Sequence, residues 1–272
     1  MSRIWFITGT SRGFGRAWAI GALSRGDRVA ATARDATALE DLVDSFGDAV
    51  LPLTFDVADR EAGMAAVRQA HEHFGRLDVV VNNAGYGHFG FVEELTEAEV
   101  RAQIDTNLLG PLWITQAAIP LLRKQGGGHI VQVSSQGGVI AFPALGIYHA
   151  SKWALEGLTE SLAQEVAGFG ITTTLIEPGG FATDWGGSSA TWSERNPIYT
   201  PILDAMAAAD PSTRRPVAAD SVDAVLAVVD AEQPPTRLLL TSAAYDRVLA
   251  GYERRLAHWR SWERVSRSVD PV

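Results

Sequence analysis

Short, strongly apolar segments alternate with longer amphipathic ones along most of the chain, and this alternation restricts the possible folds more than any other feature. The short segments contain mainly β-branched and aliphatic side chains. Such near-continuous apolar strands are typical of parallel sheets that are covered by helices on both faces. The segments that we predict to be strands are residues 4–8, 28–32, 50–54, 79–82, 129–134, 172–177 and 238–241.

The segments between these strands have the periodicity of amphipathic helices. The clearest helices are predicted over residues 14–24, 60–74, 97–123 and 148–167. Strands that alternate with helices predict an α/β fold, here a doubly wound sheet of seven parallel strands. The 272 residues, 46% of them hydrophobic, suffice for one large core, so we expect a single domain over residues 1–272.

Composition excludes several classes of protein and partner. The net charge is -9, which disfavours nucleic acid as a partner. Cysteine is absent, so disulfides and thiolate catalysis are excluded, and a reducing cytoplasm fits. No apolar run approaches the ~18–20 residues that a spanning helix needs, and the first glycine turn comes too early for a signal peptide. We therefore expect a soluble, cytoplasmic protein without a membrane partner.

A glycine-rich turn, TGTSRGFG at residues 8–15, follows the first predicted strand and begins the first helix. Gly9 would permit a tight turn, Gly13 a close approach to a pyrophosphate, and Gly15 close contact between helix and strand. The N–H groups at the start of the helix would then face the anion. The spacing differs from the common G-x-G-x-x-G pattern, so a purely structural turn remains an alternative.

The end of the second strand, RVAATARD, indicates which dinucleotide would bind. An acidic residue there would hold the ribose hydroxyl of NAD, whereas an arginine would accommodate the extra phosphate of NADP. Here the strand ends at Arg34, followed by Asp35, and Arg12 in the glycine turn offers a second positive charge. This pattern favours NADP(H). The alternative is a pair of solvated arginines, one of them neutralised by Asp35.

Tyr148 and Lys152 lie one helical turn apart in YHASKWALEGL. A phenol with an unperturbed pKa of about 10 is protonated at neutral pH and can act as an acid. A neighbouring ammonium would lower that pKa, which would help the reverse reaction. The alternative is a surface pair with no function.

Six motifs, taken together and in order, resemble the short-chain dehydrogenase/reductase family, in its branch of about 250 residues. They are the glycine turn at residues 8–15, NNAG at 82–85, Asn107, Ser135, YHASK at 148–152 and PGGFAT at 178–183. The late segment PPTRLLLTSAAY looks like the last strand of the hydroxysteroid- and retinol-dehydrogenase-like members. The resemblance implies the Rossmann form of the doubly wound sheet.

The resemblance also implies a role for each matching residue. Tyr148 would be the general acid, Ser135 would orient the substrate oxygen, Lys152 would lower the pKa of Tyr148 and hold the nicotinamide ribose, and Asn107 would hold a relay water. The expected cofactor contacts are Gly9, Ser11, Arg12, Gly13, Phe14, Gly15, Arg34, Asp56, Val57, Asn83, Ala84, Gly85, Tyr148, Lys152, Pro178, Gly179 and Thr183.

Residues 179–216 interrupt the alternation and are rich in Gly, Ser, Thr and Pro, as expected of a substrate lid. The expected pocket is mostly apolar and aromatic, without an arginine cluster to receive an anionic substrate. Its residues are Tyr86, Phe89, Gln136, Phe142, Phe181, Trp185 and Trp192. We therefore expect a small hydrophobic ketone, aldehyde or secondary alcohol as substrate.

The function that we favour is NADPH-dependent reduction of such a carbonyl compound. The oxidative direction, that of a secondary-alcohol dehydrogenase, is an alternative, and a non-catalytic NADP-sensing protein is another. No metal site is expected, because no metal-binding motif is present. Helices 97–123 and 148–167 could form a homodimer or homotetramer. The basic, helical tail at residues 244–272, with Trp259 and Trp262, would pack on its own domain or on a partner subunit.

Overall fold

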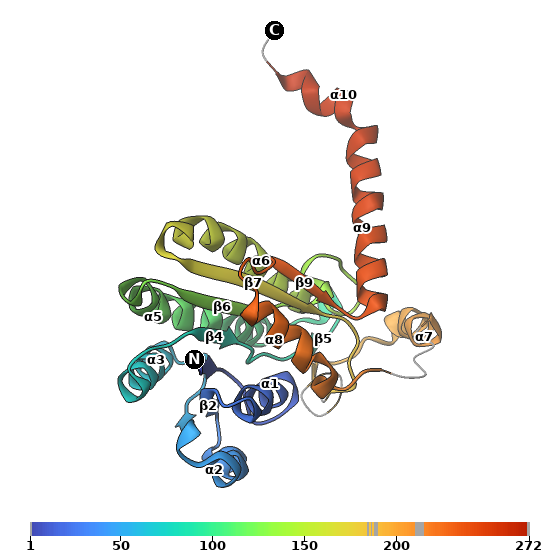
Figure 1. Ribbon diagram of the computed structural model, residues 1–272. Coiled ribbons are helices and arrows are strands. Elements are labelled where there is room, and N and C mark those ends of the chain that lie inside the picture. Colours follow the sequence, from blue (N-terminus) through green and yellow to red (C-terminus); the bar gives the residue numbers. More distant parts are fainter. Residues whose placement is uncertain (1, 184, 186, 188–189, 210–214, 271–272) are drawn as a thin grey trace.

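A seven-stranded parallel sheet forms the centre of the computed structural model, which describes residues 2–183, 185, 187, 190–209 and 215–270 (Figure 1). The strand order is β3-β2-β1-β4-β6-β7-β9, and every neighbouring pair is parallel. The strands are β1 (Ile4–Ile7), β2 (Arg28–Ala33), β3 (Val50–Thr54), β4 (Val79–Asn82), β6 (Gly128–Val133), β7 (Ile171–Pro178) and β9 (Arg237–Leu240). The predicted doubly wound fold is confirmed, with each strand end within one residue of its predicted place.

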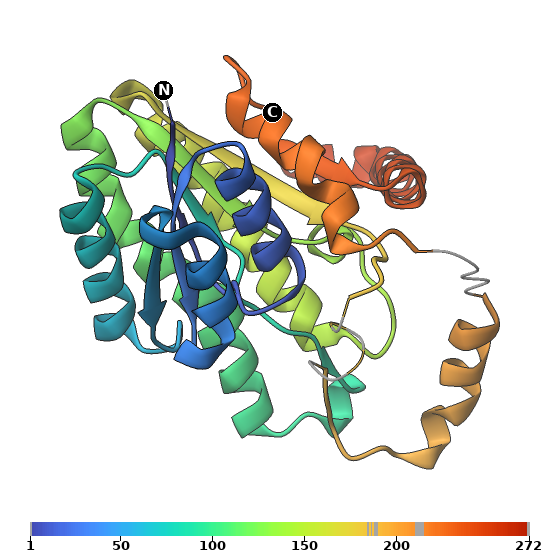
Figure 2. The same ribbon diagram turned by 60° about the horizontal axis from the view of Figure 1, so that its bottom comes forward.

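Helices cover both faces of the sheet, as Figures 1 and 2 show. Strand β1 illustrates why, because Ile4 and Phe6 enter one buried cluster while Trp5 and Ile7 enter the other. The first cluster contains residues of α3 (Arg60–Phe74), α5 (Gly110–Gln125) and α6 (Gly146–Val166). The second contains residues of α1 (Gly13–Ser24), α2 (Glu40–Phe46) and α8 (Val222–Asp230). Both faces of a strand are therefore apolar, as predicted.

The helical segment predicted over residues 97–123 is observed, but it is not one regular α-helix. The chain forms α4 (Glu97–Ile104), a five-residue π-helical turn at Asp105–Leu109, and then α5. The physical reason lies in Pro111, which lacks the N–H that would close an α-helical bond to the carbonyl of Asn107. A π turn relieves that mismatch, and such turns are frequent at functional sites. The other three predicted helices differ from the observed ones only at their ends.

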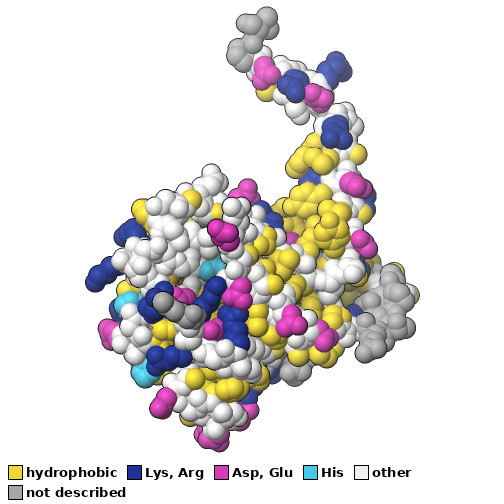
Figure 3. All heavy atoms as spheres, in the orientation of Figure 1, with side chains coloured by type: hydrophobic (Ala, Val, Ile, Leu, Met, Phe, Trp, Pro, Cys, Tyr) yellow, Lys and Arg dark blue, Asp and Glu magenta, His cyan; other side chains and the backbone are white. Residues whose placement is uncertain are grey.

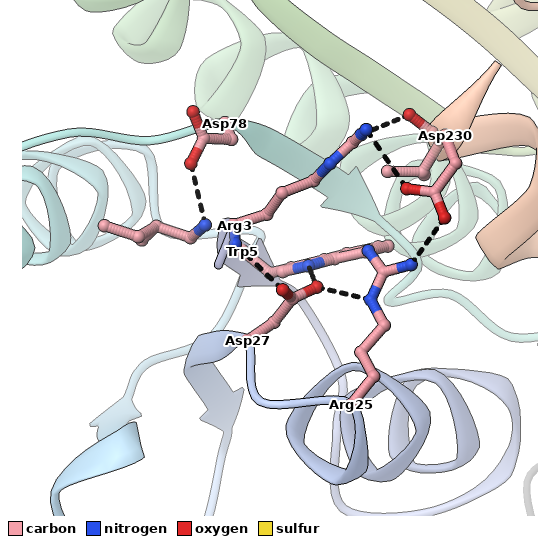
Figure 4. Close-up of polar contacts among 8 residues, drawn as sticks. Arg3, Trp5, Arg25, Asp27, Asp78 and Asp230 are labelled. Atoms are coloured by element: carbon pink, nitrogen blue, oxygen red, sulfur yellow. Dashed lines mark hydrogen bonds and ion pairs between the residues drawn. The ribbon is translucent and has the colours of Figure 1, made fainter. Parts of the chain in front are cut away.

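A polar cluster ties the chain together at the amino ends of the strands (Figure 4). The Asp27 carboxylate accepts hydrogen bonds from the backbone N–H of Arg3 and the indole of Trp5, at 2.8 Å each, and from Arg25 at 2.6 Å. Asp230 at the end of α8 pairs with Arg3 and Arg25 at 3.1 and 2.9 Å. The cluster lies at the edge of the sheet opposite the predicted site, so we assign it a structural role.

Two short strands connect the predicted lid to the body. Strand β5 (His88–Phe89) follows β4, and it pairs in parallel with β8 (Thr191–Trp192). Helix α7 (Thr200–Ala209) comes next in the lid. Of the predicted lid, residues 184, 186, 188–189 and 210–214 lie outside the described residues.

The chain ends in two helices, α9 (Ser242–Ser261) and α10 (Glu263–Ser266). Figure 1 shows that they stand away from the rest of the molecule as an arm. Among the described residues, no helix is both long enough and apolar enough to cross a membrane.

Candidate active site

The predicted site residues follow the carboxyl ends of the strands, at one edge of the sheet. Strands β1 and β4 are neighbours, and the chain builds the sheet outward in opposite directions from this pair. In doubly wound sheets, ligands bind in the crevice at such a switch point. The loops after β1 and β4 therefore form the two sides of the candidate site.

The glycine turn after β1 is held tightly against the loop after β4. Gly9 and Gly13 have positive φ angles of 70° and 60°, which a side chain would strain. A Cβ atom on Gly15 would lie only 2.4 Å from the carbonyl oxygen of Gly9 and from the side-chain amide of Asn83. That amide donates to the carbonyl of Thr8 at 2.8 Å, and the Thr8 hydroxyl accepts from the backbone N–H of Asn83 at 2.9 Å.

This packed turn fits a bound pyrophosphate. Helix α1 begins at Gly13, so its first N–H groups face the loop, and Ser11 and Arg12 are exposed beside it. Backbone N–H groups and a helix N-terminus together make an anion site. Phe14 packs edge-on against Phe181, with ring centroids 4.8 Å apart. Phe181 thus lies beside the glycine turn instead of joining the aromatic side chains around Tyr148.

Arg34 is exposed directly after β2, where the predicted adenosine end of the cofactor would lie. Asp35 is engaged elsewhere, because its carboxylate accepts hydrogen bonds from the backbone N–H and the hydroxyl of Thr37 at 3.0 and 2.9 Å. These bonds lower the pKa of Asp35. After β3, Asp56 is exposed and accepts from the N–H of Ala58 at 2.9 Å, while Val57 is buried.

Asn107 and Lys152 are both buried and lie against Gly85, where an added Cβ atom would meet the Asn107 amide oxygen at 3.0 Å and the Lys152 Nζ at 3.7 Å. The Asn107 side chain accepts from the N–H of Tyr86 at 3.1 Å and donates to its carbonyl at 3.0 Å, so the π turn holds the loop after β4. It also donates to the hydroxyl of Ser151 on α6 at 3.2 Å. The Lys152 ammonium donates to a backbone carbonyl at the end of β6 at 2.8 Å.

Tyr148 is only 5% exposed, and Ser135 lies next to it. Burial raises the pKa of Tyr148 to about 12, and a hydrogen bond with Ser135 offsets only part of this effect. Burial also lowers the pKa of Lys152 to about 8. Burial therefore dominates the pKa of Tyr148, and the expected lowering of that pKa by Lys152 stays a prediction.

Behind Lys152 lies a cluster of charged residues that the sequence analysis missed. Glu156 and Glu177 are buried, and Arg237 lies 3.0 Å from a Glu156 carboxylate oxygen and 3.5 Å from one of Glu177. Burial and the Glu156 carboxylate raise the pKa of Glu177 to about 8. Burial likewise raises the pKa of Glu156. Two signals were present in the sequence, a carboxylate four residues after Lys152 and a charge inside the apolar strand β7.

An aromatic group covers Tyr148 on the side of the predicted lid. The ring centroid of Trp185 lies 4.9 Å from that of Tyr148 and 5.4 Å from that of Phe89. Phe89 stacks on Trp192 with centroids 4.4 Å apart. A Cβ atom on Gly87 would meet the indole of Trp185 at 2.5 Å, so only glycine leaves room for this ring. Of the seven predicted pocket residues, these three therefore form one group, which contacts the candidate acid through Trp185.

The remaining pocket candidates lie around this group. Tyr86 is half-buried, with its backbone held by Asn107. Gln136 and Phe142 belong to the loop after β6, and both face Arg247 of α9. The Arg247 guanidinium donates a hydrogen bond to the side-chain oxygen of Gln136 at 3.4 Å and lies 5.8 Å from the ring centroid of Phe142. His149 fixes this loop by bonding to the carbonyl of Gly137 at 2.8 Å.

Three residues after β7 complete the predicted set. Pro178 ends the strand, and its carbonyl accepts from the Ser135 hydroxyl at 3.5 Å. Gly179 lies tightly against the start of α9, where a Cβ atom would meet Thr241 at 2.6 Å. The Thr183 hydroxyl accepts from the N–H of Trp185 at 3.4 Å. The segment therefore connects Ser135 to the aromatic group.

His88 fastens the lid to the body through the small β5–β8 sheet. Its two ring nitrogens lie 2.8 Å from the hydroxyls of Thr191 and Ser193 in the lid. The Ser193 hydroxyl donates to Glu99 of α4 at 3.1 Å, and the N–H of His88 donates to Gln103 at 2.8 Å. His88 is 2% exposed, so these partners satisfy an imidazole that is removed from water.

A cavity of about 110 Å³ lies on the outer side of the aromatic group. Its walls include Phe89, Ala144, Trp192 and Leu203, and the Arg195 guanidinium lies over the Trp192 ring at 4.5 Å. Within the described residues, no three His, Asp or Glu side chains gather with metal-binding geometry.

Comparison with known proteins identifies the family. The family model described as short chain dehydrogenase matches residues 3–194. The chain belongs to the short-chain dehydrogenase family. The predicted resemblance is confirmed at this level, and the hydroxysteroid- and retinol-dehydrogenase-like branch stays a prediction.

Individual relatives extend the likeness beyond the matched segment. An oxidoreductase from Botryotinia fuckeliana is 42% identical over 270 residues, which is 98% of each chain. The crystal structure of a short-chain dehydrogenase from Streptomyces avermitilis is 38% identical, covers 100% of this chain and 99% of its own, and gives a TM-score of 0.93. An alcohol dehydrogenase from Thermococcus sibiricus, complexed with 5-hydroxy-NADP, is 27% identical with a TM-score of 0.75 over 90% of this chain and 98% of its own.

Proposed function

We propose that this short-chain dehydrogenase is an NADP(H)-dependent oxidoreductase that reduces a hydrophobic ketone or aldehyde to the alcohol. The observation that carries the proposal is the position of Tyr148: it is buried at the carboxyl edge of the sheet, next to Ser135 and against Trp185. Carbonyl reduction needs an acid, a donor that holds the oxygen, and a water-poor pocket, and these residues would supply all three.

Tyr148 would donate the proton to the substrate oxygen as the alcohol forms. A pKa of about 12 keeps the phenol protonated throughout the neutral range, which suits the reductive direction. The oxidative direction would require the phenolate, which burial disfavours. Ser135 would donate a hydrogen bond to the same oxygen.

Bound NADPH would supply the hydride. The glycine turn with Gly9 and Gly13, the N-terminus of α1 and Arg12 would hold its pyrophosphate. Lys152 would bind the nicotinamide ribose, and Asn107 would hold a water between the buried lysine and the loop after β4. Pro178, Gly179 and Thr183 would adjoin the carboxamide, with Asp56, Val57, Asn83, Ala84 and Gly85 toward the adenosine.

Arg34 supports NADP(H) over NAD(H). It is exposed at the position that would face the adenosine ribose, and the neighbouring acid, Asp35, is already engaged by Thr37. A guanidinium forms strong, paired hydrogen bonds with a phosphate. The complex of the Thermococcus sibiricus relative with a modified NADP agrees with this preference.

The aromatic group of Phe89, Trp185 and Trp192 supports an apolar substrate. A flat hydrophobic carbonyl compound could pack on these rings with its oxygen toward Tyr148.

The proposal is tested with a panel of apolar ketones and aldehydes, by following the loss of NADPH absorbance with the purified full chain. We expect turnover of at least part of the panel, with carboxylate-bearing analogues turned over more slowly. Failure of every compound, together with no NADPH binding in a titration, would refute the proposal.

The cofactor preference is tested with Arg34→Ala. We expect NADPH binding to weaken by about 1.5–3 kcal/mol, the range for hydrogen bonds to charged groups, and NADH binding to remain nearly unchanged. Calorimetric titration of both cofactors measures this difference, with Arg16→Ala as the control, because the Arg16 guanidinium is already paired with Asp41. Equal losses for the two cofactors would reject Arg34 as the selecting residue.

We further propose that the enzyme works in the cytoplasm as a homodimer or homotetramer. Localisation of the tagged full chain and sedimentation of the purified protein test these two parts separately.

A further inference from the structure

We propose that the seam of exposed apolar residues along α9 is an interface for the α9 helix of a second copy of this chain. The seam consists of Tyr245, Leu249, Tyr252, Leu256 and Trp259. The proposal concerns assembly and does not rest on the proposed enzymatic function. Figure 3 shows apolar side chains gathered over the lower part of the arm.

The spacing of the seam is that of a helix that pairs with another helix. Its five residues are separated by four, three, four and three positions, which places all of them within about 80° of the helix circumference. This spacing is the a/d pattern of a coiled-coil seam, narrower than the apolar face of a helix that packs on a globular core. Each of the five is between 39% and 60% exposed.

The body of the same chain occupies a different face of α9. Ala244 and Val248 are buried against it, and Gly251 lies so close to Ile140 that a Cβ atom would meet that side chain at 2.7 Å. Arg255 donates to the carbonyl of Val139 at 3.0 Å. These residues lie to one side of the seam, so the seam remains open after α9 has packed on its own domain.

The arm continues beyond these contacts. Trp259 and Trp262 are 60% and 56% exposed, and Val265 is 51% exposed. In Figure 1 this part of the arm has no neighbouring element.

The area of the seam suits a self-association contact. If each of the five side chains loses roughly 100 Å² of exposed surface, two copies would bury about 1,000 Å², close to the ~1,200 Å² at which stable interfaces begin. In a two-fold contact both subunits contribute the same surface patch, so the α9 helix of each copy can pack against the α9 helix of the other.

Charge favours a second copy as the occupant. Residues 242–272 carry six arginines against four acidic residues, whereas the remainder carries 17 Lys and Arg against 28 Asp and Glu. If two α9 helices pair antiparallel, the basic far end of each arm reaches the acidic body of the other copy. Attraction between opposite net charges would then add to the packing of the seam.

The test is sedimentation velocity of the full chain at micromolar concentration, compared with the 29.2 kDa monomer mass. Leu249→Glu/Leu256→Glu places charges in the seam, and Trp259→Glu does so beyond the last body contact, where the fold is not at risk. Ala257→Glu is the matched control, because it adds the same charge to an exposed residue about 120° around the helix from the seam.

We expect both seam variants to have half the wild-type mass, with dissociation constants raised by about 30-fold or more, and the control to keep the wild-type mass. Unchanged helical circular dichroism would show that the variants fold. A monomeric wild type, or seam variants that keep the wild-type mass, would overturn the proposal. Co-sedimentation with phosphatidylserine-containing vesicles that is lost in Trp259→Glu would assign the seam to a lipid surface instead, and would also overturn it.

Discussion

A lysine that is almost fully removed from water keeps its proton only if nearby groups stabilise the charge. For Lys152, burial lowers the pKa to about 8, and the carboxylate of Glu156, one turn further along α6, acts in the opposite direction. Tyr148 and Ser151 lie on the same side of α6 as Lys152, and Asn107 faces that side from the π turn. Glu177 lies beyond Glu156, next to its carboxylate. Glu156 is therefore a positioning residue for the charge of Lys152.

This role predicts a change in pH dependence for Glu156→Gln. The attraction between the Glu156 carboxylate and the Lys152 ammonium is lost, so the pKa of Lys152 should fall, and the alkaline limb of the kcat profile should move to lower pH. The pKa falls because an ammonium that has lost a stabilising carboxylate releases its proton at a lower pH. The profile is measured between pH 6 and 10 with NADPH and the best substrate of the ketone panel.

Glu160→Gln is the matched control for that experiment. Glu160 lies one turn beyond Glu156 and also pairs with Arg237, at 2.9 Å, but its side chain is 63% exposed. We expect its profile to match the wild type. If the two variants give the same profile, the carboxylate at position 156 serves only to hold Arg237.

At the scale of elements, the site depends on three short pieces: the π turn at Asp105–Leu109 and strands β5 and β8. The π turn presents Asn107 to the loop after β4, and the paired strands hold Phe89 and Trp192 together. None has a periodic pattern of its own. The sequence signal for the π turn was Pro111 inside a helical segment, whereas the pairing of β5 with β8 joins residues about a hundred positions apart and had no local signal.

The β5–β8 contact predicts a specific effect for His88→Ala. The change leaves the hydroxyls of Thr191 and Ser193 without their ring partner. Ser193 is buried, so the loss there should cost about 1–3 kcal/mol, whereas Thr191 is exposed and its hydroxyl can bond to water instead. The lid should open more often, so KM should rise by about 10-fold or more while kcat changes less. Limited proteolysis should also cleave within residues 179–216 faster.

Val92→Ala provides the comparison, because Val92 lies four residues further on and is 76% exposed. It should leave both KM and the cleavage rate unchanged. A His88→Ala protein with wild-type KM and wild-type resistance to protease would show that the small sheet does not hold the lid.

At the scale of the whole molecule, the sequence predicted the layers of the fold correctly because they depend on local patterns. Apolar strands and amphipathic helices are readable within windows of a few residues, and the glycine turn lies between two of them. The motifs also led to the correct family. Each element and each motif consists of residues that are close in sequence, and the family follows from the order of the motifs along the chain.

The parts that could not be predicted depend on contacts between distant segments. Phe181 packs on Phe14, and Gln136 bonds to Arg247 of α9, which is 111 residues away. The pKa of Tyr148 was expected to fall because Lys152 is near in sequence, yet burial by the surrounding molecule raises it. The sequence likewise did not predict how far α9 extends beyond the rest of the molecule, because that depends on where its contacts with the other elements end.

The central claim is that Tyr148 delivers the proton to the carbonyl oxygen that is reduced. Its most direct test is the single-turnover rate of Tyr148→Phe with saturating NADPH and the fastest ketone of the panel. Because the substitution removes only a hydroxyl, NADPH affinity should stay within a few fold of wild type, and the rate should fall by about 10²–10⁴-fold, the usual contribution of general acid catalysis. A Phe variant that reduces the ketone at a near wild-type rate would contradict the account.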